Sequence, residues 1–274
     1  MKILFIIGSS KNGNTTEIIS YFKSKLTGDY QIEDLYLSDY PIDFCIGCHN
    51  CIMLGEEKCP HYESVKKIEE KILESDITVL SSPGYMFSIT GIMKNFLDHV
   101  AYNCHRPKYF GKKIFYIGNC TKWQNNSLIT PMSTWGSATG FKSAGKLFVD
   151  IYPFPLTDKE LDTRRKTIEK GVVEFEKNIK NNEIKPDFGS LMVFRAFRTI
   201  SQLAPGIMKA DKQYMEKIGA YNPEKKWFID VKIPLFKRIM ADIIEKSMKK
   251  SINSMIDKDR LSSAKSGIFR NKLM

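Results

Sequence analysis

Four cysteines lie within fifteen consecutive positions, and their spacing is typical of ligands for a metal centre. They follow the pattern C-x2-C-x2-C-x7-C-P and are Cys45, Cys48, Cys51 and Cys59. Three cysteines at successive i+3 steps can direct their thiolates into one small concavity, and Gly47 and Gly55 allow the sharp bends that such a loop needs. Structural zinc is more often held by two C-x2-C knuckles with a longer spacer, so the spacing favours an iron–sulfur cluster over zinc. Thiols that hold no metal are a third possibility.

The polar turn after the first apolar run could bind a phosphate group. It reads GSSKNGNTTE from Gly8 to Glu17, and its glycines, its hydroxyls and the following helix N-terminus suit an anion. Asn14 stands where a nucleotide P-loop has its lysine, and no G-x-G-x-x-G motif occurs, so a triphosphate and a tightly held dinucleotide are disfavoured. The turn therefore predicts a site for one phosphate monoester, bound by Ser9, Lys11, Gly13, Asn14, Thr15 and Thr16. The alternative is an ordinary capped turn, with Asn14 as the N-cap and Glu17 completing a capping box.

Apolar runs that alternate with helical patterns place both motifs on an α/β sheet. Strands are expected at Lys2–Gly8, Ile32–Leu37, Ile77–Ser82, Ile114–Gly118 and Leu147–Ile151. Helices are expected at Thr15–Leu26, Glu63–Glu74, Gly91–Tyr102 and Asp158–Asn181. Such alternation is typical of a right-handed, doubly wound parallel sheet with strand order 2-1-3-4-5, which binds ligands at the carboxyl ends of its strands, near strands one and three.

Two segments resemble a known family of flavoproteins. The turn GSSKNGNTT resembles the FMN phosphate loop of the flavodoxin-like family, and residues 81–98 are similar to the S-P-x-Y…G-x-x-K-x-F-x-D pattern of the NAD(P)H-dependent FMN reductases. In that family the loop after strand three wraps the isoalloxazine ring. The resemblance covers roughly residues 1–150 and implies FMN as the cofactor of a flavodoxin-like, doubly wound, five-stranded parallel sheet.

On that resemblance, residues at the ends of strands three and four also contact FMN. They are Pro83, Tyr85, Met86, Phe87, Ser88 and Asn119. Pro83 stiffens its turn, and Tyr85 and Phe87 offer flat apolar area to a ring. The alternative for this segment is a hydrophobic connection between a strand and a helix. The chain departs from the family pattern after the fourth strand, where a glycine-rich turn is usual but Gly118 is the one glycine, and Cys120 is expected to be a small buried side chain.

The cysteine pattern resembles that of the iron–sulfur flavoproteins, in which a compact cysteine motif follows strand two. Bacterial ferredoxins use the related run C-x2-C-x2-C-x3-C-P for cubane clusters. The resemblance implies that a [4Fe–4S] cluster exchanges single electrons with FMN and is held by Cys45, Cys48, Cys51 and Cys59. His49 and His61 flank the motif and are expected beside the cluster or at the protein surface rather than as ligands.

The 274 residues divide into a predicted FMN-binding domain, residues 1–182 with the cysteine loop 45–59, and a basic helical extension, residues 183–274. The charge is concentrated at the C-terminal end, because the last 93 residues contain 19 Lys and Arg against 10 Asp and Glu. No nucleic-acid-binding motif accompanies this charge, so no nucleic-acid partner is expected. Helical patterns lie near Leu191–Gln202 and Pro234–Met255. The apolar stripe of the second favours packing on the FMN domain or on a partner subunit, and its lysines leave a weak contact with a membrane surface open.

These features predict an FMN-dependent oxidoreductase that takes electrons from NAD(P)H or ferredoxin and relays them singly through an iron–sulfur cluster. No Ser/His/Asp set or paired acid–base motif occurs, so no side chain is assigned as catalytic. Two other classes stay open: a non-enzymatic FMN and iron–sulfur electron carrier reduced by ferredoxin, and a zinc-stabilised interaction protein of flavodoxin-like fold. A homo-oligomer, either dimer or tetramer, is expected. A cytoplasmic location is expected, because neither a leader peptide nor a membrane span is recognised.

Overall fold

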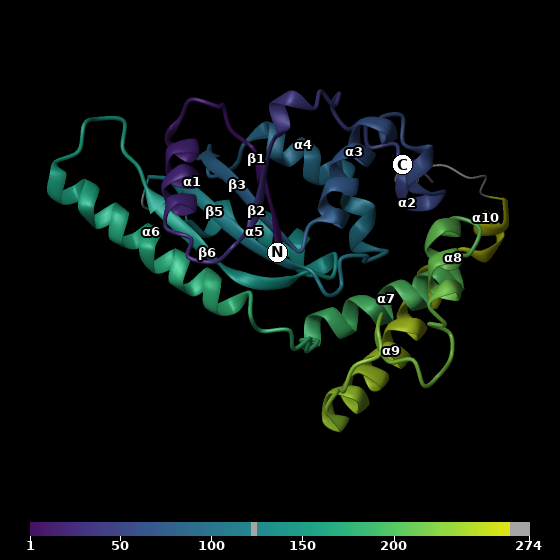
Figure 1. Cartoon of the computed structure of the whole chain (residues 1–274). Helices are drawn as coiled ribbons and strands as arrows, with labels where there is room; N and C mark the ends of the chain where they lie inside the picture. The colour runs from purple at the N-terminus through teal and green to yellow at the C-terminus, as the bar shows by residue number, and fades with distance from the viewer. Residues whose placement is uncertain (122–124, 264–274) are drawn as a thin grey trace. The chain divides into compact units, whose positions relative to one another are not determined.

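The computed structural model describes residues 1–121 and 125–263, which form two compact units (Figure 1). The first unit contains residues 1–44, 63–100 and 109–182, and the second contains residues 45–62, 101–108 and those from 183 onward. The cysteine loop is therefore grouped with the C-terminal helices rather than with the sheet.

Five parallel strands form the sheet of the first unit. In chain order they are β1 (Lys2–Ile7), β2 (Gln31–Tyr36), β3 (Ile77–Tyr85), β5 (Lys113–Cys120) and β6 (Lys142–Asp150). Their order across the sheet is β2-β1-β3-β5-β6, which confirms the predicted doubly wound order 2-1-3-4-5 of a flavodoxin-like fold. Residues 3–7 of β1 are fully buried, as its continuous apolar run predicts for a strand that is covered on both faces.

Helices cover both faces of this sheet. The helices of the first unit are α1 (Asn14–Ser24), α3 (Tyr62–Glu74), α4 (Gly91–His99), α5 (Asn125–Ala138) and α6 (Asp158–Asn178). α1 and α6 share one face with β5, where the rings of Phe22, Phe115 and Phe175 have centroids 5.2–5.6 Å apart. α4 and α5 meet through Phe96 and Trp135, whose ring centroids are 6.0 Å apart. The faces are thus held by aromatic contacts in a close-packed core.

The largest differences from the sequence-based expectation concern the edge strand β6 and a short strand that was not expected. β6 begins at Lys142 rather than at Leu147. The sequence does not reveal its first five residues because they lie at the edge of the sheet, are only partly buried and do not form an apolar run. A two-residue strand, β4 (Ser88–Ile89), pairs antiparallel with the end of β3 and turns the predicted connection into a hairpin. This hairpin carries the aromatic segment singled out in the sequence.

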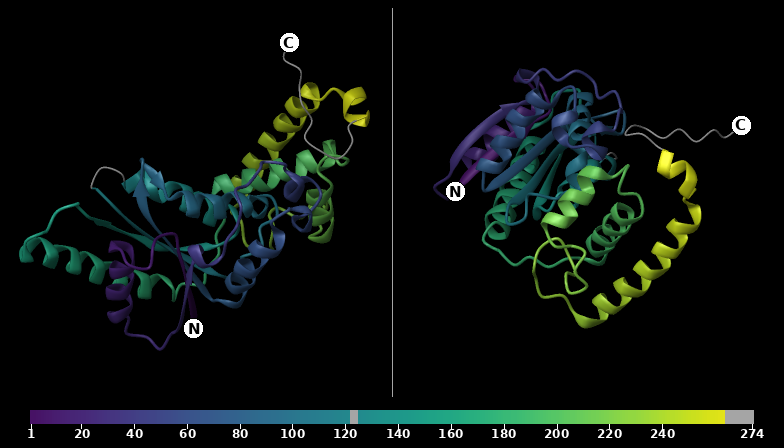
Figure 2. Two further views of the ribbon diagram at one scale, coloured as in Figure 1. Left: turned by 90° about the horizontal axis from the view of Figure 1, so that it is seen from above. Right: turned by 90° about the vertical axis from the view of Figure 1, so that its right-hand side faces the viewer.

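The second unit is helical. Its helices are α2 (Asn50–Met53), α7 (Phe188–Leu203), α8 (Lys209–Lys217), α9 (Leu235–Met255) and α10 (Lys258–Ser263). α7 and α9 are the two helices that the sequence predicts, and α7 lies beside both α8 and α9 (Figure 2). α8 was not expected, because its nine residues are mostly charged or polar and only Ala210, Asp211 and Met215 are buried. Within the described residues, no helix combines the length and the apolar character that crossing a bilayer requires.

Candidate functional site

A cavity of about 410 Å³ lies in the first unit at the carboxyl ends of β1, β3, β5 and β6. Its volume is within the range of small-molecule sites, and its place is where doubly wound sheets bind ligands. Seven residues that the sequence analysis assigned to FMN line it: Ser9, Gly13, Asn14, Thr15, Pro83, Tyr85 and Asn119. The structure adds seven that the sequence reasoning did not assign to it: Ser10, Gly84, Cys120, Thr121, Ile151, Tyr152 and Pro153.

The phosphate loop leaves β1 through a glycine that has no room for a side chain. A Cβ atom on Gly8 would lie 2.9 Å from Cβ of Met93 on α4. The backbone of Gly8 is also fixed from two sides, since its N–H donates to the carbonyl of Ser81 at 2.8 Å and its carbonyl accepts from Oγ1 of Thr90 at 2.7 Å. The loop therefore starts from a rigid point beside β3.

The N-terminus of α1 opens on this loop without a side-chain cap. The capping box at Asn14 and Glu17 does not form, because the helix begins at Asn14 and its N-cap is Gly13, which has no side chain to accept a hydrogen bond. The first N–H groups of a helix need an acceptor, and the partial positive charge of the helix end favours an anion. This end of α1 thus suits a phosphate group.

Thr15 ties the start of α1 to the end of β5. Its hydroxyl donates to Oδ1 of Asn119 at 2.7 Å, and both side chains are buried. Because the two residues are far apart in the sequence, this hydrogen bond fixes the width of the cavity between the phosphate loop and β5. The same hydrogen bond holds Asn119 in the wall of the cavity, although no glycine-rich turn follows this residue.

The hairpin between β3 and β4 has an unusual turn. Gly84 pairs with Ile89 and Tyr85 with Ser88, so the turn consists of Met86 and Phe87. Both have left-handed backbones, with φ of 47° and 59°, a conformation that such two-residue turns normally fill with Asn and Gly. The turn is therefore strained, and strained residues cluster at ligand sites.

The apolar side chains of this hairpin are exposed to solvent. The exposed fraction is 65% for Tyr85, 90% for Met86 and 61% for Phe87. Tyr85 lines the cavity, whereas Met86, Phe87 and the half-buried Ser88 lie outside its lining. The hairpin thus presents an uncovered apolar surface beside the cavity, which a flat apolar ligand could cover.

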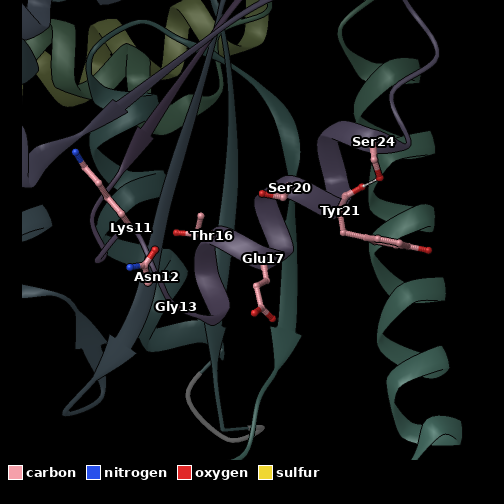
Figure 3. A pocket seen from close by; sticks show the side chains of 8 residues that line it. All are labelled: Lys11, Asn12, Gly13, Thr16, Glu17, Ser20, Tyr21 and Ser24. Atoms are coloured by element: carbon pink, nitrogen blue, oxygen red, sulfur yellow. Dashed lines mark hydrogen bonds between the residues drawn. The ribbon is translucent and has the colours of Figure 1, made fainter.

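Two predicted phosphate-binding residues, Lys11 and Thr16, line a neighbouring hollow of about 640 Å³ along α1 (Figure 3). Nζ of Lys11 forms an ion pair with Asp39 at 2.9 Å, and the hydroxyl of Thr16 donates to the carbonyl of Ser10 at 3.0 Å. Figure 3 shows Lys11 and Glu17 extending in different directions along the walls of this hollow. The structure therefore does not bring Lys11 and Thr16 together with the other predicted contacts, and Gly13 is shared by both spaces.

The cysteine loop of the second unit bends at three residues with left-handed backbones. Gly47 has φ of 63°, His49 of 59° and Gly55 of 134°, so both glycines occupy bends that other residues disfavour. Cys45 is exposed, and the other three cysteines are half-buried. Among the described residues, no three Cys, His, Asp or Glu side chains are grouped closely enough to hold a metal ion.

The four thiols nevertheless lie near enough to influence one another. Burial raises the pKa of Cys51 to about 11, and the negative charges that Cys59, Cys48 and Cys45 would carry add to this effect. Burial also raises the pKa of Cys59. Thiolates at these positions would thus repel one another in a partly desolvated loop, and a bound metal or cluster would relieve that repulsion.

Arg106 holds the cysteine loop from within the second unit. Its guanidinium donates to the carbonyls of Cys51 at 2.6 Å and Ile52 at 3.0 Å. It also pairs with Glu56 at 3.1 Å and with the fully buried Asp211 of α8 at 2.5 Å. The sequence reasoning missed this set because Arg106 and Asp211 are 105 positions apart and neither belongs to a motif.

Comparisons with known proteins find relatives of this chain both in sequence and among solved structures. Residues 1–136 match the model of the NADPH-dependent FMN reductase family. One iron–sulfur flavoprotein from Archaeoglobus fulgidus is 26% identical over 234 residues, which cover 80% of this chain and 99% of that protein. A second from the same organism is 36% identical over 101 residues, which cover 36% of this chain and 48% of the relative, so there the match spans about half its length.

Among solved structures, an FMN-dependent NADH-azoreductase from Bacillus anthracis in complex with FMN is 13% identical, with a TM-score of 0.47, and the match covers 63% of this chain and 98% of that one. The strand order and the cavity at the sheet edge define a flavodoxin-like α/β protein. Over residues 1–136, just under half of its length, the chain is similar to the NADPH-dependent FMN reductase family.

The strain in the hairpin turn gives a stability prediction. Replacing its residues together, Met86→Asn with Phe87→Gly, should raise the free energy of unfolding of the flavin-free protein by about 2 kcal/mol, because the new residues tolerate left-handed backbones. The pair Met86→Ala with Phe87→Ala is the matched control, since it removes the same side chains but keeps the strain. Urea unfolding would measure both, and equal stabilities for the two pairs would contradict the strain.

The contacts of Arg106 give a second prediction. Arg106→Met should lower the free energy of unfolding by about 3 kcal/mol, because it leaves the buried Asp211 without its main cation. Amide hydrogen exchange in α2 should become faster, because the carbonyls of Cys51 and Ile52 lose a donor. The double variant Arg106→Met with Asp211→Leu should recover part of the stability but not the slow exchange. Unchanged protection of α2 in Arg106→Met would refute this role.

Proposed function

We propose that the chain is an FMN-dependent oxidoreductase that takes electrons from NAD(P)H and binds FMN in the 410 Å³ cavity. The observation that carries this proposal is the uncapped N-terminus of α1 at one end of a cavity whose other walls come from β3, β5 and β6. The family match to NADPH-dependent FMN reductases over residues 1–136 supports both the cofactor and the donor.

The walls of the cavity suit the phosphate end of FMN. Among the described residues that line it, no side chain is charged, so the phosphate would be held by the backbone N–H groups of α1 and by hydroxyls. Ser9 and Ser10 provide those hydroxyls at the start of the loop, because the hydroxyl of Thr15 already donates to Asn119. A site of fixed dipoles stabilises an anion without a compensating cation and so favours one phosphomonoester.

The walls near β3 suit the ring of FMN. Pro83 and Tyr85 line the cavity, and Met86 and Phe87 extend the apolar surface beyond it. We assign these residues to the ring because they are flat or apolar and would otherwise remain exposed to water. Tyr152, which the sequence analysis did not single out, adds a second aromatic side chain from the segment after β6.

Bound FMN would accept a hydride from NAD(P)H and pass electrons on in pairs or singly. The residues of this chain bind and orient it rather than exchange protons, since the described lining contains no His, Asp, Glu or Lys side chain. A site of this composition agrees with the lack of an acid–base motif in the sequence.

The binding site can be tested by comparing FMN with riboflavin. The double variant Ser9→Ala with Ser10→Ala should bind FMN at least about tenfold more weakly, because it loses hydroxyl donors to the phosphate. Its affinity for riboflavin, which lacks the phosphate, should change much less. Ser20→Ala is the matched control, because Ser20 lies on α1 but lines only the neighbouring hollow. Quenching of flavin fluorescence measures all three, and an unchanged preference for FMN over riboflavin in the double variant would refute the site.

The reductase class can be tested by anaerobic mixing with NADPH or NADH. Direct bleaching of the flavin absorbance supports an oxidoreductase that uses a nicotinamide donor. Bleaching by reduced ferredoxin alone would instead support the electron carrier, and a protein that stays colourless after incubation with FMN would support the zinc-stabilised interaction protein.

We further propose that Cys45, Cys48, Cys51 and Cys59 hold a [4Fe–4S] cluster that relays single electrons. Four thiols on one loop, bent at Gly47, His49 and Gly55, supply the donor set of such a cluster. The names of the two Archaeoglobus relatives support the same assignment.

The cluster assignment predicts separate losses. In anaerobically purified protein, Cys48→Ala or Cys51→Ala should abolish the broad absorbance of the cluster and the bound iron and sulfide, while FMN stays bound. Cys104→Ala is the matched control, since this half-buried cysteine lies in the same unit but outside the motif. Stoichiometric zinc without sulfide in the unsubstituted protein would refute the cluster and favour zinc.

A further inference from the structure

The outer face of α9 is apolar and uncovered. Five side chains in its first three turns are between 49% and 67% exposed: Leu235, Phe236, Ile239, Met240 and Ile243. Helical spacing puts these positions on one side of the helix, because residues three and four apart are neighbours. Figure 2 shows α9 running along the margin of the helices of its unit. A contiguous apolar surface of this kind marks an interaction site.

Buried ion pairs fix the rotation of α9 that turns this face outward. Arg195 of α7 is only 1% exposed and pairs with Asp242 at 2.8 Å and with Glu245 at 3.3 Å. Nε of Arg198, also on α7, donates to Glu245 at 2.8 Å. Rotating α9 to bury its apolar side would leave both buried arginines without a carboxylate, which is strongly unfavourable. The helix is thus amphipathic with its acidic side inward.

The charges that remain on α9 are all basic. Its two acidic residues, Asp242 and Glu245, are both paired inward, whereas its basic residues are Lys237, Arg238, Lys246, Lys249 and Lys250. Lys246 and Lys250 continue the row of Ile239 and Ile243 at spacings of three and four residues, so they share the outer side. The outer face therefore combines apolar side chains with positive charge and contains no carboxylate.

This combination determines what can cover the face. A second copy of the chain would bring lysines against lysines, because the outer face offers no acidic partner. An anionic lipid surface complements both properties, since acyl chains cover the apolar residues and headgroups pair with the lysines. The apolar row from Leu235 to Ile243 is about 13 Å long, which suits a helix lying in the interface plane and is too short for a span.

We propose that the outer face of α9 is a binding site for the surface of a membrane that contains anionic phospholipids. The first three turns insert apolar side chains at the level of the headgroups, and Lys246 and Lys250 contact the lipid phosphates. Neither an apolar row nor a basic cluster of this size anchors a protein strongly alone, so the contact is reversible and depends on both.

Vesicle flotation tests this site with the full chain. The protein should float with vesicles of phosphatidylcholine and phosphatidylglycerol in a two-to-one ratio and should remain below with phosphatidylcholine alone. The triple variant Phe236→Ser, Ile239→Ser and Ile243→Ser should bind the mixed vesicles at least about tenfold more weakly. The variant Lys246→Gln with Lys250→Gln should lose the preference for anionic vesicles and the sensitivity to salt. Val173→Ser is the matched control, because Val173 is an exposed apolar residue on α6.

All substituted residues except Val173 lie on the outer face of α9, so folding should be retained and circular dichroism checks it. Equal flotation of the triple variant and the control, or no flotation of the unsubstituted protein, would overturn the proposal. Light scattering in solution provides the other decisive result. A dimer that the triple variant converts to a monomer, without any flotation, would assign the face to a second copy instead.

Discussion

The candidate flavin site depends on one topological constraint. Strands β1 and β3 are neighbours in a parallel sheet, and the sheet is doubly wound, so the chain leaves these strands toward opposite faces. A crevice must remain between the two departing segments, and the start of α1, which has no side-chain cap, lines it. Gly8 is part of this constraint, because a side chain at this position would clash with Met93 and push the loop away from α4. The cavity is therefore a consequence of the strand order, and Thr15 and Asn119 only set its width.

The second unit has no sheet and depends on a different kind of contact. Arg106 and Asp211 connect the cysteine loop to α8, and Arg195 and Arg198 connect α7 to Asp242 and Glu245 on α9. Buried ion pairs add little net stability, but each becomes strongly unfavourable when one partner is misplaced. They therefore select one arrangement of the short helices more effectively than apolar contacts, which tolerate sliding. The cysteine loop gains a fixed backbone at Cys51, where a cluster ligand would need one.

The sequence predicts the sheet well because its inner strands are buried on both faces and read as unbroken apolar runs. The outer half of β6 and the two residues of β4 lack such runs, and their positions follow from pairing with neighbours rather than from local pattern. The same distinction holds at the site. Glycines, hydroxyls and cysteines at short spacing are visible in the sequence, whereas Tyr152 and the Arg106–Asp211 pair enter through tertiary contacts between distant segments. Lys11 and Thr16 illustrate the opposite case. The motif assigns the whole loop to phosphate binding, but in the structure the side chains of these two residues line the neighbouring hollow along α1.

Among the described residues, the hairpin and α9 both expose apolar side chains, and their surroundings differ in a way that separates their ligands. Met86 and Phe87 occupy a strained turn with Tyr85 beside a cavity that has no charged side chain in its described lining, which suits a rigid, flat ligand of fixed size. The residues of α9 form a row on a regular helix that continues into lysines, which suits an extended and deformable surface of opposite charge. In both cases, the exposure is imposed from inside, by hairpin pairing in one unit and by buried arginines in the other. Exposing an apolar side chain to water is unfavourable. Where the packing of the rest of the protein keeps such side chains exposed, they indicate a binding surface for a ligand or partner outside the chain.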